Sequence, residues 1–270
     1  MSRLTFNIAD LHGRSDILNM ALKTIRNYMA DKYMADKDKF NIPNIVFTGN
    51  YIDRGPDSKG VIDRLIKLTK TKTAYGLKYN SVVTLKGNHE SFMLDAYLGI
   101  GIDFWVMYNG GAQTYKSYGL APFTANYQFP EEHIRFVLGL PLYRDDGKRL
   151  YVHAGVDNGK SLEDQEESRL RWKMYNSHPS RLSQREDGLE DSDMYNIYGE
   201  THDMDIGVRH VVHGHHQFED GPMLFTNRSN FDTLAWYTGR LVIGVFDSDT
   251  KGGPIDTIEV NGSHYNRRYR

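Results

Sequence analysis

Short apolar runs recur along the chain, and a polar loop follows several of them. Residues 3–8 alternate between polar and apolar side chains, which predicts a strand with one buried face. After the polar residues 10–13, apolar side chains recur at helical spacing over residues 17–29, and Ser15 is a candidate cap for that helix. The beginning of the chain is therefore predicted to form a strand, a loop and a helix in succession.

The same succession of elements occurs twice more. Residues 44–48 and 81–85 are apolar runs of strand length, and a helix with one apolar face is predicted from about Asp57. Three units of this kind in succession predict a layered α/β fold whose polar loops gather at one edge of a sheet.

Strand-like runs also occupy much of the second half of the chain. They lie at residues 149–152, 211–212, 223–225, 231–236, 241–246 and 255–260. We expect the strands after residue 210 to form a second, largely antiparallel sheet that packs on the first.

Two segments lack a regular pattern. Residues 157–207 are charged and aperiodic, and we expect a surface excursion with one short helix near 166–175, a candidate lid. Residues 262–270 are expected to fray. With 270 residues and 39% hydrophobic content, residues 1–270 have enough apolar side chains for one sizeable core, and we expect a single domain.

Composition excludes some classes of function. The net charge of −2 gives no general attraction to nucleic acid or to acidic membranes. There is no cysteine, so a bound metal would need oxygen and nitrogen ligands, and no disulfide is available. No signal-like core and no run of about 18 apolar residues occurs, and we therefore expect a soluble cytoplasmic protein with no membrane partner.

Five short polar motifs each follow an apolar run. They are Asp10-Leu11-His12-Gly13, Gly49-Asn50-Tyr51-Ile52-Asp53-Arg54-Gly55, Gly87-Asn88-His89-Glu90, His153-Ala154-Gly155 and His213-Gly214-His215. In this order they resemble the signature of the phosphoprotein phosphatase family, within the calcineurin-like metallophosphoesterases, and in particular its bacterial and phage-lambda-type serine/threonine phosphatases. The resemblance implies a two-sheet β-sandwich flanked by helices, with the site at the sheet edge.

The resemblance also implies two divalent metal ions, Mn²⁺ as first choice with Fe or Zn as alternatives. Asp10 and His12 would hold the first ion, and position 50 would bridge both. The second ion would be held by Asn88, His153 and His215. A hydroxide that bridges the two ions would then attack the phosphoester.

Other residues of the motifs match the proton donor and the phosphate-binding groups of the family. His89 resembles the general acid, and Asp53 the carboxylate that fixes its tautomer. Arg54 resembles a guanidinium that binds phosphate, and Asn88 would also contact substrate. A second arginine is expected where this chain has Met174, so Arg171 or Lys173 is expected to substitute for it.

Several histidine and aromatic residues, and one further segment, have less specific interpretations. His213 is interpreted as a packed or supporting residue, while His216 is left open between a substrate contact and simple exposure. Trp105, Tyr108 and Tyr115 are expected to pack in helices rather than to stack on bases. Residues 227–233 resemble a family strand whose Asp-Thr pair supports the metal loops.

Asn50 departs from the family pattern, which has Asp at this position. A neutral amide is a poorer bridging ligand than a carboxylate, so we expect weakened metal binding and low turnover. Two explanations stay open: an engineered substitution in an otherwise active enzyme, which we favour, and a natural pseudo-enzyme.

The function implied is hydrolysis of phosphomonoesters, namely phosphoserine and phosphothreonine in proteins or a small phosphoester. One alternative is a symmetrical dinucleoside polyphosphate hydrolase or RNA-cap pyrophosphatase, for which a capped RNA end would be the nucleic-acid partner. The other is an inactive phosphate-binding pseudo-phosphatase.

Overall fold

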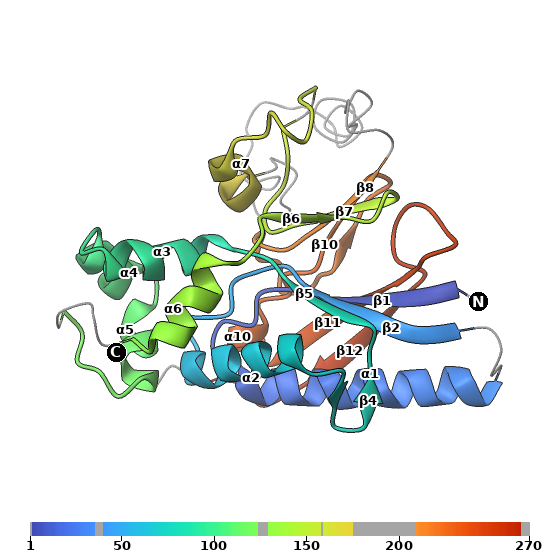
Figure 1. Cartoon of the computed structure of the whole chain (residues 1–270), viewed down its shortest axis with the longest axis horizontal. Helices are drawn as coiled ribbons and strands as arrows, with labels where there is room; N and C mark the ends of the chain where they lie inside the picture. The colour runs from blue at the N-terminus through green and yellow to red at the C-terminus, as the bar shows by residue number, and fades with distance from the viewer. Residues whose placement is uncertain (1, 36–39, 124–128, 158, 175–208, 266–270) are drawn as a thin grey trace.

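Two five-stranded sheets form the centre of the molecule, and helices lie against the first of them (Figure 1). The computed structural model describes residues 2–35, 40–123, 129–157, 159–174 and 209–265. The strand order is β12-β11-β1-β2-β5 in the first sheet and β6-β7-β8-β10-β9 in the second. This arrangement confirms the α/β prediction of two packed sheets flanked by helices.

The first sheet combines parallel and antiparallel pairing. Its strands are β1 (Ser2–Ile8), β2 (Phe40–Phe47), β5 (Ser81–Thr84), β11 (Arg240–Asp247) and β12 (Asp256–Asn261). β1, β2 and β5 run parallel, whereas β11 pairs antiparallel with β1 and with β12. The loops that follow the three parallel strands therefore leave the sheet at the same end.

The second sheet has a parallel centre with antiparallel edges. Its strands are β6 (Tyr143–Asp145), β7 (Arg149–Val152), β8 (His210–His213), β9 (Met223–Leu224) and β10 (Arg228–Asn230). β7, β8 and β10 are parallel neighbours, and the short strands β6 and β9 pair antiparallel at the two edges.

This topology corrects three points of the prediction for the second half of the chain. The strands after residue 210 do not form one sheet, because β11 and β12 join β1 in the first sheet. The expected strand at residues 231–236 is also wrong: β10 ends at Asn230, and Ala235–Thr238 form the short helix α10. The centre of the second sheet is parallel rather than antiparallel, because β8 pairs with the earlier strand β7.

The helices lie mainly between the strands of the first half of the chain. They are α1 (Ser15–Ala35), α2 (Ser58–Lys70), α3 (Asn88–Tyr97), α4 (Ile102–Tyr108), α5 (Gly111–Ser117), α6 (Glu131–Leu138) and α7 (Glu167–Trp172). A small hairpin, β3 (Thr73–Ala74) with β4 (Leu77–Lys78), follows α2. α1 and α2 run along the outer face of the first sheet, and α3 to α6 gather beyond one end of it (Figure 1).

The starts of α1 and α2 differ in how they are capped. Asp57 caps α2, because its Oδ1 accepts from the Gly60 backbone N–H at 2.9 Å. Ser15 is already the first residue of α1, so its predicted capping role is wrong, and its hydroxyl donates instead to Asp57 Oδ2 at 2.5 Å. The two helix starts are thus joined to each other near the loop after β1.

β1 is buried on both faces. Leu4, Phe6 and Ile8 pack with residues of α1 and α2, as the alternation predicts. Thr5 and Asn7, which were expected to be the solvent-facing positions, are 9% and 0% exposed because the second sheet covers that face.

No helix within the described ranges is long and apolar enough to span a membrane.

The predicted excursion and tail are described only in part. Residues 159–174 contain α7, close to the short helix expected there, and residues 175–207 lie outside the described part of the chain. Of the tail predicted to fray, residues 262–265 make hydrogen bonds with the rest of the chain, and residues 266–270 lie outside the described part. The Gly262 N–H donates to Gly239 O at 2.8 Å, and the Ser263 carbonyl accepts from Arg14 Nη2 at 2.8 Å.

Candidate active site

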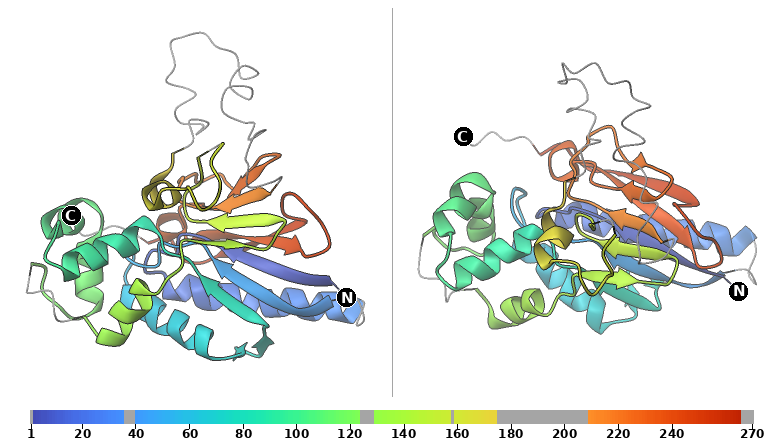
Figure 2. Two further views of the ribbon diagram at one scale, coloured as in Figure 1. Left: turned by 45° about the horizontal axis from the view of Figure 1, so that its top comes forward. Right: turned by 90° about the horizontal axis from the view of Figure 1, so that it is seen from above.

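The five motifs meet at one end of the sandwich, where the loops after β1, β2, β5, β7 and β8 approach one another. Backbone hydrogen bonds tie them together directly: the His12 N–H donates to Asn50 O at 2.8 Å, and the Gly214 N–H donates to His153 O at 2.9 Å. Figure 2 shows that this end faces helices α3 to α5, with the N-terminus of β1 at the opposite end.

Asp10 and Asn50 are bound to each other. The Asn50 Nδ2 amide donates to Asp10 Oδ1 at 2.9 Å, and the His215 backbone N–H donates to Asp10 Oδ2 at 3.0 Å. Burial, and then the nearby Asp232 carboxylate, raise the pKa of Asp10 well above its usual range. The Asn50 Oδ1 accepts from the His89 backbone N–H at 3.2 Å, so this amide links three of the motifs.

Asn88 and His153 present lone pairs to each other. The His153 Nδ1 lies 2.7 Å from the carbonyl oxygen of Thr48, and burial lowers the pKa of the ring to about 3, so a neutral ring donates through Nδ1. Its Nε2 is then an acceptor, yet it faces Asn88 Oδ1, another acceptor, at 2.9 Å. A cation shared by the two atoms would resolve this contact.

His12 and His215 are also neutral acceptors within the site. The His12 Nδ1 donates to Ile52 O at 2.8 Å, which leaves Nε2 as an acceptor for Arg54 Nη1 at 3.3 Å. The His215 ring lies 5.0 Å from the His153 ring, centroid to centroid. Burial is the main cause that lowers the pKa of both His12 and His215. Neutral imidazoles of this kind are suitable metal ligands.

Two glycines of the motifs allow the loops to come this close. A Cβ at Gly214 would lie 1.9 Å from Asp10 Oδ2, and a Cβ at Gly87 would lie 2.4 Å from Asn50 Oδ1. Any side chain at either position would push the candidate ligands apart.

The donor set fits divalent metal ions in its atom types but is short of negative charge. The six candidates supply oxygen and imidazole nitrogen, and the facing acceptors of Asn88 and His153 suit a cation. Among the described residues, no group of three or more His, Cys, Asp or Glu side chains is placed to hold a metal ion. Two of the six candidates are asparagines, and Asp10 is the one carboxylate in the set.

His89 and Asp53 form a buried pair next to these ligands. The His89 Nδ1 lies 2.6 Å from Asp53 Oδ2, and the two rings of His89 and His12 are 4.6 Å apart. Trp105 Nε1 and Thr114 Oγ1 also donate to the Asp53 carboxylate, at 2.7 and 2.6 Å. Burial lowers the pKa of His89, and the Asp53 carboxylate opposes that effect. The pair therefore holds the ring with Nε2 directed away from Asp53.

The two candidate phosphate-binding arginines occupy different positions. The Arg54 guanidinium lies beside His12 and 5.7 Å from the centre of the Trp236 ring. Arg171, on α7, donates to Ser91 Oγ on α3, and its charge is one cause of the lowered pKa of His153. Lys173, the alternative to Arg171, is instead paired with Asp157 at 2.6 Å.

Two further acidic residues lie at the site: Glu90, which was not assigned a role from the sequence, and Asp232, which was expected to give support. Glu90 accepts backbone N–H bonds from Gly87, Asn50 and Tyr51 at 2.8, 2.9 and 2.8 Å, and so joins the β2 loop to α3. The spacing Gly87-x-x-Glu90 is that of a capping box, which was an available signal. Asp232, within the segment expected to give support only, has a buried Oδ2 with no hydrogen-bond partner in the described residues.

The remaining predictions about aromatic and histidine residues are resolved by burial. His213 is fully buried, as expected for a packed residue, and His216 is 1% exposed and donates from Nε2 to Lys173 O at 2.7 Å. Trp105 and Tyr115 are buried among helices, whereas Tyr108 is 74% exposed and does not pack as expected.

Backbone strain is concentrated at the site. Nine non-glycine residues in the described ranges have positive φ, and six of them are candidate site residues: Asp10, His12, Asn50, Asp53, Arg54 and His215. Such conformations cost on the order of 1 kcal/mol or more each and persist where surrounding contacts impose them.

Comparisons with known proteins agree with this fold. The model of the calcineurin-like phosphoesterase family matches residues 6–218. A comparison with curated proteins gave no match. A solved structure of a candidate diadenosine tetraphosphatase is similar over 97% of this chain and 94% of its own, with 19% identity and a TM-score of 0.58.

Two solved phosphatases show the same likeness. The cold-active protein-tyrosine phosphatase of a Shewanella species has 17% identity and a TM-score of 0.53, over 94% of this chain and 80% of its own. A protein serine/threonine phosphatase from Saccharomyces cerevisiae has 12% identity and a TM-score of 0.50, over 98% and 82%. At these identities the likeness shows a shared fold, and the match over residues 6–218 shows that the chain belongs to the calcineurin-like phosphoesterases.

Proposed function

We propose that this protein hydrolyses phosphomonoesters, and specifically phosphoserine and phosphothreonine in proteins, with two divalent ions of which Mn²⁺ is the first choice. Its family acts on phosphoesters at a centre of two divalent metal ions. The observation that carries the proposal is the buried His89–Asp53 pair, with a 2.6 Å contact, placed beside neutral ligand histidines and Arg54.

Six side chains would hold the ions: Asp10, His12, Asn50, Asn88, His153 and His215. When bound, the ions supply an activated water and neutralise charge on the phosphoryl oxygens. The neutral state of the three histidines leaves ring nitrogens free to bind a cation.

His89 would donate the proton that the leaving oxygen requires. Its Nδ1–H is held by Asp53, so Nε2 is the atom that gives up the proton, and the carboxylate stabilises the charged ring before transfer. Trp105 and Thr114 keep Asp53 in place through hydrogen bonds to its two oxygens. Arg54 would grip the phosphoryl group, with Asn88 and Arg171 as further substrate contacts.

Asn50 would make this chain an impaired form of the enzyme. The Asn50 amide donates a hydrogen bond to Asp10 Oδ1. This carboxylate oxygen is therefore engaged by Asn50, whereas an aspartate at position 50 would leave it available to a metal ion. A single carboxylate among six ligands gives weak attraction for two divalent ions. Low turnover is therefore expected, whether Asn50 is an engineered or a natural substitution.

One observation favours a second candidate, hydrolysis of dinucleoside polyphosphates. Phe92 lies 5.6 Å from the His89 ring, and Phe104 and Trp172 lie 5.8 and 5.5 Å from Phe92, all as ring centroids. Phe104 and Trp172 are 55% and 43% exposed. Exposed aromatic rings beside a phosphate site can stack on nucleobases.

Turnover of two substrates separates these candidates. The Asn50→Asp variant with Mn²⁺ is assayed on a phosphoserine peptide and on a symmetrical dinucleoside tetraphosphate, with His89→Ala in the same background as control. We expect faster release of phosphate from the peptide, lost in the control. Preference for the dinucleotide would instead support the second candidate, and no turnover of either would leave a phosphate-binding pseudo-enzyme.

A further inference from the structure

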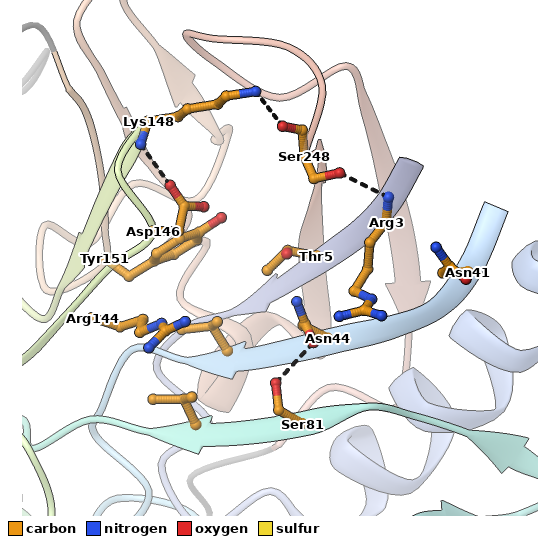
Figure 3. A pocket seen from close by; sticks show the side chains of 12 residues that line it. Arg3, Thr5, Asn41, Asn44, Ser81, Arg144, Asp146, Lys148, Tyr151 and Ser248 are labelled. Carbon is orange, nitrogen blue, oxygen red and sulfur yellow. Dashed lines mark hydrogen bonds between the residues drawn. The ribbon is translucent and has the colours of Figure 1, made fainter. Parts of the chain in front are cut away.

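A polar cavity of about 370 Å³ lies between the two sheets, at the end of the sandwich away from the candidate active site (Figure 3). It is lined from the first sheet by residues of β1, β2 and β5 and by Ser248 after β11, and from the second sheet by β6, β7 and their turn. None of the lining residues is a candidate active-site residue, although Tyr151 lies two positions before His153.

Buried polar atoms in and beside this cavity have no hydrogen-bond partner among the described residues. They include the Arg3 Nε. The Tyr151 hydroxyl, on a side chain that is 1% exposed, meets the Thr5 side chain across the cavity and has no other hydrogen-bond partner in the described residues. Asn7 lies on the same face of β1 as Thr5, one step deeper, and both polar atoms of its side chain are also unpartnered. Unsatisfied buried groups of this number imply that a polar molecule completes their hydrogen bonds.

The charge of the cavity selects an anion. Arg3, Arg144 and Lys148 line it together with a single carboxylate, Asp146. That carboxylate is already engaged by the backbone N–H groups of Lys148 and Arg149, at 2.9 and 2.7 Å. The Arg144 guanidinium is at the exposed mouth, where it can meet a ligand in the bidentate manner typical of phosphate binding.

The rest of the lining favours a hydroxylated ligand body rather than an apolar one. Thr5, Asn44, Ser81 and Ser248 supply hydroxyl and amide groups, and Val46 and Val83 are the apolar contributors. Asn44 Oδ1 accepts from Ser81 Oγ at 2.8 Å and from Asn80 Nδ2 at 2.9 Å, which orients the Asn44 amide nitrogen away from these donors, towards the cavity (Figure 3). The volume suits a small metabolite.

The geometry points to a second, non-catalytic site that binds a small phosphorylated polyol, of the size of a pentose phosphate. Arg3 and Arg144 supply the positive charge for the phosphate, and Lys148 adds its charge although its Nζ donates to the Ser248 carbonyl. Tyr151 and Asn44 bind hydroxyl groups of the body. This inference does not depend on the proposed function, because it uses other residues at the other end of the sheets.

Binding is tested by calorimetry on the metal-free chain carrying Arg54→Ala, which weakens phosphate binding at the active site. Ribose 5-phosphate, inorganic phosphate and uncharged ribose are titrated at one ionic strength. We expect saturable binding of one ribose 5-phosphate per chain, weaker binding of phosphate and none of ribose. Arg144→Ala and Tyr151→Phe should each weaken ribose 5-phosphate binding at least about tenfold.

Two controls separate binding from folding and from general charge. Tyr151→Phe removes a hydroxyl whose one polar neighbour among the described residues is Thr5, so its melting temperature should stay close to that of the parent. Arg135→Ala removes an exposed arginine of α6, far from the cavity, and should leave binding unchanged.

Three outcomes would overturn the inference: no saturable binding of ribose 5-phosphate, unchanged binding in Arg144→Ala and Tyr151→Phe, or equal loss in Arg135→Ala. Equal affinity for inorganic phosphate would overturn the assignment of a hydroxylated body.

Discussion

The side-chain amide of Asn50, in the loop after β2, contacts the carboxylate of Asp10, in the loop after β1. In the metal-free protein its Nδ2 donates to Asp10 Oδ1 at 2.9 Å. An aspartate there would place two carboxylates face to face, which repel when empty and attract divalent ions when both are ligands.

We predict that Asn50→Asp lowers the melting temperature of the metal-free protein and raises Mn²⁺ affinity by at least about tenfold. Titration calorimetry and thermal melting in chelator and in Mn²⁺ measure the two effects. Unchanged affinity would show that residue 50 does not bind the metal.

Asp53 acts on His89 through one hydrogen bond and is itself held by two others. An amide in its place cannot stabilise the charged ring, so we predict that Asp53→Asn, in the Asn50→Asp background, lowers kcat by roughly 10²- to 10⁴-fold with little change in KM. Steady-state kinetics on a phosphopeptide gives the two constants.

Thr114→Val is the matched control, since it removes the hydroxyl that donates to the Asp53 carboxylate and accepts from the Asp53 backbone N–H, but leaves the carboxylate against His89. Its kcat should fall far less. A similar fall in both variants would mean that Asp53 has a structural role only.

At the level of residues, the sequence identified those that lie in recognisable motifs. Asp10, His12, Asn50, His89 and His153 could be proposed as site residues because each stands in a short motif after a strand, and the fold brings these motifs together. The contacts of two others could not be predicted: Glu90 binds backbone N–H groups of a loop about forty positions earlier, and Asp232, expected only to give support, acts through its charge near Asp10. Neither partner can be seen until the chain is folded.

The start of α3 depends on Glu90 as a junction between elements. Its two oxygens accept three backbone N–H bonds, two of them from the loop after β2. Glutamine offers one acceptor oxygen and turns an amide donor towards those N–H groups.

Burial raises the pKa of Glu90 to about 7, so the carboxylate is fully charged only at a higher pH. At such a pH we predict that Glu90→Gln lowers the free energy of unfolding by about 1.5 to 3 kcal/mol, as expected for hydrogen bonds to a charged group. Urea unfolding measures the loss. No loss would mean that water replaces the carboxylate in holding the loop.

The start of β8 makes stability depend on pH through His210. Burial lowers the pKa of this histidine from 6.5 to about 4. Above pH 6.5 the His210 ring is neutral in both the folded and the unfolded chain. As the pH falls towards 4, His210 binds a proton in the unfolded chain but not in the folded chain, so the free energy of unfolding decreases.

We predict that the free energy of unfolding falls between pH 7 and pH 5, and that the fall is smaller in His210→Gln. The limit of this contribution is about 3 kcal/mol. Urea unfolding at the two pH values gives the difference, which does not depend on the absolute stability of the variant. An equal fall in both proteins would rule out His210 as a cause.

At the level of elements, the positions of the strands were predicted better than the pairing between strands. Residues 211–212 and 241–246 lie in strands as expected, yet β8 and β11 belong to different sheets. Local alternation indicates a strand but carries no information on pairing, and β11 pairs with β1, more than two hundred residues earlier. The strand predicted at residues 231–236 was wrong because its apolar residues are buried in a loop and in α10, and a short buried segment of that kind has the same sequence pattern as a buried strand.

The whole molecule is a sandwich with different chemistry at its two ends. At one end, loops from both sheets bring acceptor atoms together, and positive φ values are concentrated there. At the other, unpartnered polar atoms and cationic side chains surround a cavity. The apolar residues between them pack on α1 and α2 and keep the ends apart.

The central claim, that these loops form a centre for two divalent ions, is tested most directly by anomalous scattering. Crystals of the Asn50→Asp variant grown with Mn²⁺ are measured at the manganese absorption edge. The account predicts two anomalous peaks about 3.5 to 4 Å apart, one beside Asp10 and His12 and the other beside Asn88, His153 and His215. No peak at these residues, with Mn²⁺ absent or bound elsewhere on the molecule, would contradict it.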